Sequence, residues 1–130
     1  MAKTHGPRFV RLVDEAKKTV RECSIEDVKR RLDAGERLVL VDIREESEFA
    51  LDHLPASIHL GKGILERDIE ELGPDTNREI ILYCGGGYRS AIAGESLARM
   101  GYTQVISMAG GIRAWRAAGF PVVREPAKSG

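Results

Sequence analysis

Hydrophobic and polar residues alternate along the chain in blocks that fit a succession of strands and helices. Short branched apolar runs are typical of buried strands, and longer stretches with apolar residues three or four positions apart fit helices with one buried face. The pattern predicts strands at Val20–Cys23, Leu38–Ile43, Ser57–Leu60, Glu79–Tyr83 and Gln104–Met108. It predicts helices at 9–20, 24–34, 64–72, 90–100 and 111–118.

The residues that flank these segments support the prediction. Ser24 opens a Ser-Ile-Glu-Asp sequence that can cap a helix, and Gly35 is well placed to end it. The stretch between Ile43 and Ser57, which contains Pro55, is expected to be a loop. Strands that alternate with helices predict an α/β fold, with a central, mostly parallel sheet of about five strands and helices on both faces. In such folds ligands bind at the carboxyl ends of the strands.

Length and composition fit one globular domain with one core. The chain has 130 residues, of which 42% are hydrophobic and 31% charged. We expect an amino-terminal extension with an extra helix over residues 1–19, the main domain over 20–124 and a loose tail over 125–130. Residues 1–8 are also expected to be loose, whereas the apolar stripe of the following helix favours packing on the domain.

Charge and cysteine content exclude several classes of protein. The 20 basic and 20 acidic residues cancel, and aromatic residues are only 5%, so we expect no nucleic-acid partner. No apolar run approaches the roughly 20 residues of a membrane span, and no secretory signal is visible, so we expect no membrane partner. Two cysteines cannot form a disulfide framework, which favours a reduced, cytoplasmic protein. The scattered histidines give no metal-binding pattern.

The segment CGGGYRS, residues 84–90, combines a thiol, a glycine run and a cation after a predicted strand. Glycines accept positive φ and let the backbone curl round a small object. The N–H groups at the start of the next helix point to the same place and stabilise an anion: the Cys84 thiolate, a sulfur bound to it or a substrate oxyanion. Cys84 is therefore a candidate nucleophile, and Arg89 a fixed cation for an anionic substrate.

Three segments of the chain together resemble the rhodanese family of sulfurtransferases, over about residues 20–123. They occur in the order and with the spacing of that family. The first is VDIREESEF at 41–49, followed by HLPASI at 53–58; the second is the loop at 84–90; the third is GGIRAW at 110–115, followed by GFPV at 119–122. The chain is similar to a single-domain rhodanese with an extra amino-terminal helix, and the resemblance implies the rhodanese-like α/β fold.

The resemblance also implies a two-step transfer of sulfane sulfur. Cys84 would take the outer sulfur of a donor such as thiosulfate, a polysulfide or a persulfide, and become a persulfide itself. A nucleophilic acceptor, which is cyanide in an assay and a thiol or a protein in a cell, would then remove the sulfur. No metal and no organic cofactor is implied. The substrate-binding residues would be Gly85, Gly86, Gly87, Tyr88 and Arg89.

Other hypotheses use the same loop. Four residues separate Cys84 from Arg89, one fewer than in cysteine phosphatases of related fold, so the loop suits sulfur better than the phosphate or arsenate of a phosphatase or arsenate reductase. A non-enzymatic carrier that delivers a persulfide to a partner protein is the main alternative. Several thiosulfate-using relatives place a cation soon after the cysteine, where this chain has Gly85 and Gly86. Here we expect an open mouth that favours a bulky partner.

The remaining candidates have structural interpretations. The family resemblance makes Asp42 and Arg44 an element that ties loops together and His53 a loop-fixing residue, while Trp115 is expected to pack. The acidic clusters at 42–48 and 66–75 are expected to be solvated.

The roles of Cys23 and Tyr88 stay open. Cys23 is a candidate resolving thiol for Cys84, but a bystander role is favoured because no C-x-x-C motif joins them. Tyr88 either lines the pocket or shields the loop. His5 and His59 have no companion ligands.

Overall fold

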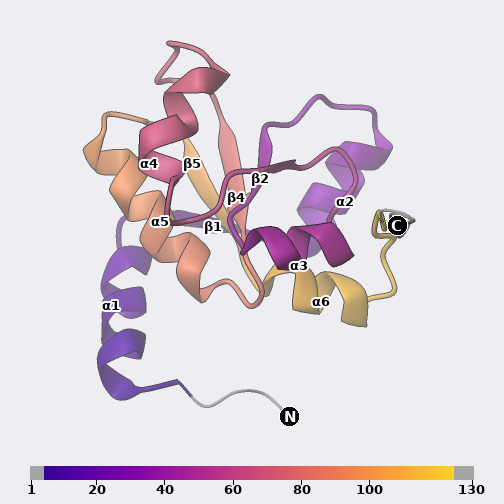
Figure 1. The fold of residues 1–130 in the computed structure, drawn as a ribbon, viewed down its shortest axis with the longest axis horizontal. Helices are drawn as coiled ribbons and strands as arrows, with labels where there is room; N and C mark the ends of the chain where they lie inside the picture. Colours follow the sequence, from indigo (N-terminus) through magenta and orange to yellow (C-terminus); the bar gives the residue numbers. More distant parts are fainter. Residues whose placement is uncertain (1–4, 125–130) are drawn as a thin grey trace, which may run out of the picture.

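In the computed structural model, which describes residues 5–124, five strands form one parallel sheet in the order β1-β5-β4-β2-β3. The strands are β1 (Arg21–Cys23), β2 (Leu40–Asp42), β3 (Ile58–His59), β4 (Ile80–Tyr83) and β5 (Val105–Met108). The helices are α1 (Pro7–Lys17), α2 (Ile25–Asp33), α3 (Glu46–Leu51), α4 (Leu65–Asp68), α5 (Tyr88–Arg99) and α6 (Gly111–Ala117), with a 3-10 turn at Ile69–Leu72. Figure 1 shows helices on both sides of the sheet, which confirms the predicted α/β architecture.

Side chains of the central strand β4 alternate between two apolar layers. Ile80 and Leu82 pack with residues of α4 and α5, whereas Ile81 and Tyr83 pack with residues of α2 and α6. All four residues of β4 are buried, as its uninterrupted apolar run predicts. The alternation continues beyond the strand, so the next residue, Cys84, belongs to the layer under α5. The alternation along the strand therefore places the Cys84 side chain in the layer that contains α5 and not in the layer of α2 and α6.

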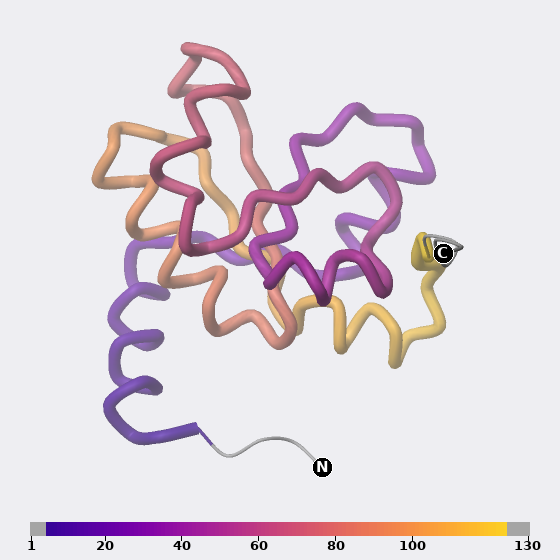
Figure 2. The backbone as a smooth tube through the Cα atoms, in the orientation of Figure 1, coloured from indigo at the N-terminus to yellow at the C-terminus, as the bar shows by residue number. Residues whose placement is uncertain are grey.

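The amino-terminal helix α1 packs on α5, as its apolar stripe predicts. Val13 and Ala16 are fully buried against Ala91 of α5. The backbone trace shows α1 beside α5 at one edge of the molecule (Figure 2). The expectation that residues 1–8 are loose is wrong for their described part, because the ring centroids of His5 and Tyr88 lie 4.4 Å apart. The expected tail at 125–130 lies outside the described residues, and the boundary at residue 19 stays a prediction.

Helix α3 occupies part of a stretch that was expected to be a loop. Its six residues bury no side chain, so the apolar periodicity that identifies helices is missing. A reciprocal capping box starts the helix instead: the Glu45 side chain accepts from the backbone of Glu48, and Glu48 Oε1 accepts from Glu45 N at 3.0 Å. Helix α5 also begins two residues earlier than predicted, so Tyr88 and Arg89 belong to its first turn.

Two kinds of feature are absent from residues 5–124. None of their helices has the length and apolar character needed to cross a membrane. No group of three or more His, Cys, Asp or Glu side chains among them is arranged to hold a metal ion.

Candidate active site

Cys84 follows the central strand β4 and lines a cavity of about 580 Å³. The residue is 1% exposed, and its Sγ accepts a hydrogen bond from the backbone N–H of Gly87 at 3.2 Å. Gly87 is the N-cap of α5, which has no side-chain cap. The sulfur therefore accepts from the N–H of the N-cap residue itself, at a helix start that has no side-chain cap. This is the arrangement of thiol and helix start that the sequence predicts.

The three glycines of the loop have different structural roles. Of the three, only Gly87 has a positive φ, +93°, and a β-carbon there would lie 3.0 Å from Gly110 N. The freedom of glycine to take a positive φ is therefore used at Gly87 and not at Gly85 or Gly86. At Gly86 the space of a side chain is taken by Arg113, whose Nη1 is 3.3 Å from the position of a β-carbon. A guanidinium group from another helix therefore lies beside the loop at this position, and the expected open mouth stays a prediction.

Two buried hydroxyl groups support the sulfur from the α5 side. Ser90, in the first turn of α5, has its Oγ 3.6 Å from Cys84 Sγ and 2.7 Å from Oγ of Ser107 in β5. Both serines are fully buried. A paired hydroxyl can adjust its proton to the charge on sulfur, so this pair can serve both a thiol and an anion. Ser107 is absent from the sequence prediction, although a serine inside a buried apolar strand was a usable signal.

Tyr88 and Arg89 line the cavity together with Cys84, as do Gly85 and Gly86, and this location agrees with the prediction. Arg89 Nη2 lies 3.7 Å from Oε1 of Glu48 in α3, so a carboxylate partly balances its charge. Sequence reasoning placed Glu48 only in a solvated cluster and did not assign it to the site.

An aromatic wall, formed by His5, Phe9 and Tyr88, closes the cavity on the α1 side. The ring centroids of His5 and Phe9 are 4.4 and 6.1 Å from that of Tyr88. All three residues line the cavity. Tyr88 therefore lines the pocket, and the amino-terminal segment contributes to the site. The sequence carries no local signal for this contact, because His5 and Phe9 are distant from Cys84 along the chain.

The start of α6 holds the loop from the opposite side. The backbone N–H groups of Ile112 and Arg113 donate to the carbonyl oxygens of Cys84 and Gly85, each at 3.0 Å. Gly111 permits this approach, because a β-carbon there would overlap Cys84 O and lie 2.6 Å from Gly85 O. The sequence prediction did not include Arg113 among the site residues, although it lies in the third segment of the family resemblance.

A buried ion cluster joins β2 to α6. Arg44 Nη2 donates to Asp42 Oδ2 at 2.8 Å and to the carbonyl oxygen of Asp52 at 2.5 Å. The carboxylate of Asp52 accepts two hydrogen bonds from Arg116, which hold the pKa of Asp52 below its usual range. This confirms the structural interpretation of Asp42 and Arg44. It also shows that Asp42, with no exposed surface, is not part of a solvated cluster.

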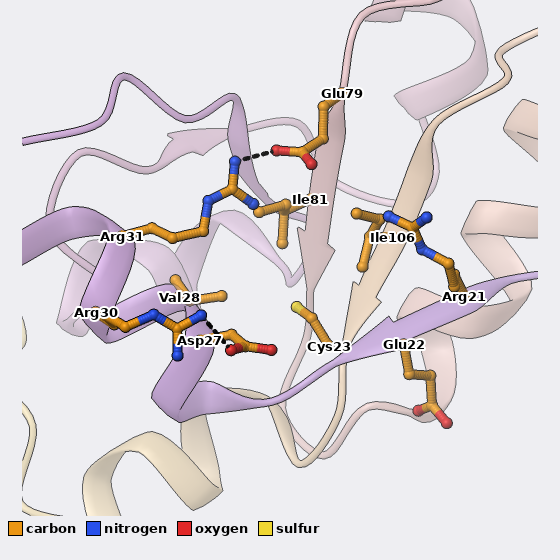
Figure 3. A pocket seen from close by; sticks show the side chains of 10 residues that line it. All are labelled: Arg21, Glu22, Cys23, Asp27, Val28, Arg30, Arg31, Glu79, Ile81 and Ile106. Carbon is orange, nitrogen blue, oxygen red and sulfur yellow. Dashed lines mark hydrogen bonds and ion pairs between the residues drawn. The ribbon is translucent and has the colours of Figure 1, made fainter. Parts of the chain in front are cut away.

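Cys23 lies on the other side of the sheet from Cys84. It ends β1, pairs in register with Met108 and packs in the layer of α2 and α6. It lines a separate cavity of about 270 Å³. Figure 3 shows its sulfur on the same side as Val28 and Asp27 of α2. Burial, with a smaller contribution from Asp27, raises the pKa of the Cys23 thiol to about 11. The structure does not bring the two thiols together, in agreement with the bystander interpretation.

His53 and Trp115 have the structural roles expected of them. His53 Nδ1 bonds to the carbonyl oxygen of Phe49 at 3.1 Å, within a buried turn. Trp115 is fully buried, and its Nε1 donates to the carbonyl oxygen of Pro121 at 2.8 Å. His59 likewise serves the backbone, since its Nε2 lies 2.7 Å from the carbonyl oxygen of Arg44.

Known proteins share this sequence and architecture. The family model "Rhodanese-like domain" matches residues 24–118. A sulfurtransferase of Allochromatium vinosum is 35% identical over 104 residues, which cover 80% of this chain and 95% of that protein. The Bacillus subtilis "Putative sulfur carrier protein YrkF" is 33% identical over 97 residues, which cover 75% of this chain. The match spans only 51% of YrkF.

A solved structure agrees with these sequence matches. A Rhodopseudomonas palustris protein, described as of unknown function and a possible tyrosine phosphatase, superposes with a TM-score of 0.79 at 30% identity. The superposition covers 95% of this chain and 99% of that one, so the likeness extends to the amino-terminal helix. The family model, the Allochromatium relative and the parallel sheet with Cys84 at its centre lead to one conclusion: this chain belongs to the rhodanese-like domain family.

Proposed function

We propose that this protein is a sulfurtransferase that carries a sulfane sulfur as a persulfide on Cys84. Family membership and relatives named for sulfur transfer or sulfur carriage support sulfur transfer as the general activity. The finer proposal is that Cys84 carries the sulfur, that its persulfide is the intermediate, and that the substrates belong to two classes. The donor is thiosulfate, a polysulfide or a persulfide, and the acceptor is cyanide, a small thiol or a protein thiol. A reducing, cytoplasmic setting is part of the proposal because the cycle needs Cys84 as a free thiol.

Each step of the proposed cycle breaks one sulfur–sulfur bond and forms a new bond to the transferred sulfur, which is an S–S bond in the first step and the C–S bond of thiocyanate in the second. The Cys84 thiolate attacks the outer sulfur of thiosulfate, a new S–S bond forms, and the old S–S bond breaks with its electron pair leaving on sulfite. With a protonated organic persulfide, the leaving group is the corresponding thiolate. In the second step cyanide attacks the outer sulfur of the Cys84 persulfide, which releases thiocyanate and restores the thiolate. The charges balance in each step, and no oxidant or metal is needed.

The observation that carries the proposal is the hydrogen bond from Gly87 N–H to Cys84 Sγ at the uncapped start of α5. A helix N-terminus favours negative charge, so this position stabilises a thiolate and then a persulfide anion. The short Cys84–Arg89 loop, with four intervening residues, leaves less room for a tetrahedral oxyanion than the longer loop of a cysteine phosphatase. Sulfur transfer is therefore favoured over phosphate hydrolysis at this site.

Mass spectrometry with a panel of sulfur donors tests the proposal directly. Incubation with thiosulfate or a persulfide is expected to add one sulfur to the peptide that contains Cys84, and cyanide is expected to remove it as thiocyanate. The peptide that contains Cys23 serves as an internal control and should stay unmodified. Absence of a Cys84 adduct with every donor would contradict the proposal.

Turnover measurements separate the enzyme from its two alternatives. An enzyme releases thiocyanate and sulfite over many cycles, whereas a carrier loads one sulfur and turns over poorly with small acceptors. Hydrolysis of an aryl phosphate without sulfite release would instead identify a phosphatase. A chain that keeps its amino-terminal segment should be used, because His5 and Phe9 line the cavity.

A further inference from the structure

A guanidinium group from α6 lies over the start of the active-site loop. Arg113 is fixed at the edge of the Cys84 cavity by its backbone N–H, which donates to Gly85 O. Its Nη2 is 3.7 Å from the point where a β-carbon on Gly85 would lie, and Nη2 of Arg89 is 4.0 Å from the same point. Two guanidinium groups, one from α5 and one from α6, therefore flank a single space beside the loop.

This space has an excess of positive charge. Glu48 is 3.7 Å from Arg89, but no carboxylate within residues 5–124 forms an ion pair with Arg113. Asp52, which also lies beside α6, is already bonded to Arg116 in the last turn of that helix. Two cations that share one carboxylate are unfavourable as neighbours, and an anion placed between them removes the repulsion. The arrangement suits a bound oxyanion.

Glycine at positions 85 and 86 keeps this space available. Neither residue has a positive φ, so the backbone does not require glycine at either position. A β-carbon on Gly86 would press on Arg113, at 3.3 Å from Nη1 and 3.9 Å from Cζ. Larger side chains would displace the guanidinium from the loop. The absence of side chains at both positions is therefore explained by the room that the two cations and an anion need.

We propose that Arg113 and Arg89 together bind the anionic group of the sulfur donor, beside the sulfur that passes to Cys84. This inference rests on the proposed sulfur transfer and names its donor class: a molecule with a sulfonate or carboxylate near its sulfane sulfur. Guanidinium groups bind such oxyanions through paired, charge-assisted hydrogen bonds. The cavity, about 580 Å³, admits both thiosulfate and the persulfide of a small acidic thiol. The loop has no cation at the two positions after Cys84, and Arg113 supplies one from α6.

The test measures the rate of Cys84 persulfide formation in the 130-residue protein with three donors. Thiosulfate carries a sulfonate, glutathione persulfide carries carboxylates, and cysteamine persulfide carries only an amine. Arg113→Ala is expected to lower the second-order rate constant for an anionic donor about tenfold or more, because one charge-assisted hydrogen-bonded contact is lost. The rate with cysteamine persulfide should change less than twofold. Arg113→Lys should recover part of the loss, and the salt dependence of the anionic reaction should weaken in Arg113→Ala.

The pattern across donors identifies the anion. A loss confined to thiosulfate assigns the site to the sulfonate, and a loss confined to glutathione persulfide assigns it to a carboxylate; either result supports the proposal. Equal losses with all three donors, or no loss with any, would overturn it. If the unaltered protein fails to form a persulfide with every donor, the sulfur transfer itself is refuted, which is a separate outcome.

Two further variants separate charge from structure. Gly86→Ala should reproduce the donor-selective loss by displacing the guanidinium, and should add little once Arg113 is already alanine. Additive losses would mean that Gly86 acts without Arg113 and would count against the proposal. Arg99→Ala removes the same charge from the far, exposed end of α5 and should leave all three rates within twofold. A loss in Arg99→Ala like that in Arg113→Ala would show that only net charge matters.

Discussion

Two cysteines in this chain occupy the same kind of position, yet their surroundings differ. Cys23 ends β1 immediately before α2, and Cys84 follows β4 immediately before the loop that leads into α5. In parallel α/β proteins both positions face the edge where ligands bind. At α2, however, Ser24 Oγ accepts the hydrogen bond from Asp27 N at 3.0 Å, so the cap position is already filled. At α5 no side chain fills that position, and the sulfur of Cys84 accepts instead from the N–H of the N-cap residue Gly87.

The charged residues near the two helix starts differ as well, and this difference again separates Cys84 from Cys23. The first turn of α2 contains Glu26 and Asp27, whereas that of α5 contains no acidic residue and carries Arg89. Acidic neighbours disfavour a thiolate, and a helix start with a nearby cation favours one. Burial does not make this difference, because Cys84 is the more buried of the two residues. Under the proposed function, a strand-terminal cysteine is reactive where no side chain caps the following helix and no carboxylate opposes the thiolate.

The largest expected effect separates the two thiols by substitution. Cys84→Ser should lower sulfur transfer from thiosulfate to cyanide by a factor of about 10³ or more, because the nucleophile of both steps is removed. The matched variant Cys23→Ser should keep transfer within about twofold, since Cys23 does not line the cavity of Cys84. Circular dichroism should show both variants folded. Comparable losses in the two variants would remove the distinction between the cysteines.

The next effect is on the chemical reactivity of Cys23. Its pKa of about 11 leaves roughly one molecule in a thousand ionised at pH 8, about a hundredfold fewer than for an unperturbed thiol. Because the pKa is raised, the alkylation rate should rise about tenfold per pH unit and level off only near pH 11. Iodoacetamide labelling of Cys23 in the Cys84→Ser variant, followed by mass spectrometry between pH 7 and 10, measures this. A plateau below pH 9 would contradict the assigned environment.

A smaller effect concerns the support that α6 gives to the Cys84 loop. Gly111→Ala places a β-carbon against Cys84 O and Gly85 O at a φ of +58°, so strain and overlap act together. Gly119→Ala is the matched control, with a φ of +76° and open space around it. Gly119→Ala should cost about 1 kcal/mol of unfolding free energy, and Gly111→Ala about 2 kcal/mol more. Urea denaturation compares them; equal costs would mean that the approach of α6 to the loop is not tight.

The elements that the sequence predicts correctly are those with strong apolar periodicity. Strands β2, β4 and β5 and helices α2, α5 and α6 bury residues at regular spacing, so their existence follows from local pattern. Helix α3 buries nothing and is stabilised by the Glu45–Glu48 capping box, so hydrophobic pattern alone does not predict it. The same limit applies to the site. Cys84 and Arg89 lie in one local motif and are found from it.

The other site residues meet Cys84 only through tertiary contacts. His5 and Phe9 reach the cavity because α1 packs on α5, and Arg113 reaches it because α6 starts against the loop. Glu48 arrives on the helix that the sequence does not predict. Contacts between distant segments leave no local pattern in a single sequence, so the sequence indicates the candidate nucleophile and not most of the residues around it.

The smallest effect tests the helix cap beside Cys23. Ser24→Ala removes the oxygen that accepts from Asp27 N and should cost about 1 kcal/mol of unfolding free energy. Ser47→Ala, at an exposed position within α3, is the control and should stay within about 0.5 kcal/mol of the unaltered protein. Sulfur transfer by both variants should be unchanged when measured well below their unfolding midpoints. If Ser24→Ala instead slowed transfer as much as it lowered stability, the start of α2 would be coupled to the site at Cys84. The two helix starts would then not be independent, and the contrast between a filled and an unfilled cap would no longer explain why only one thiol reacts.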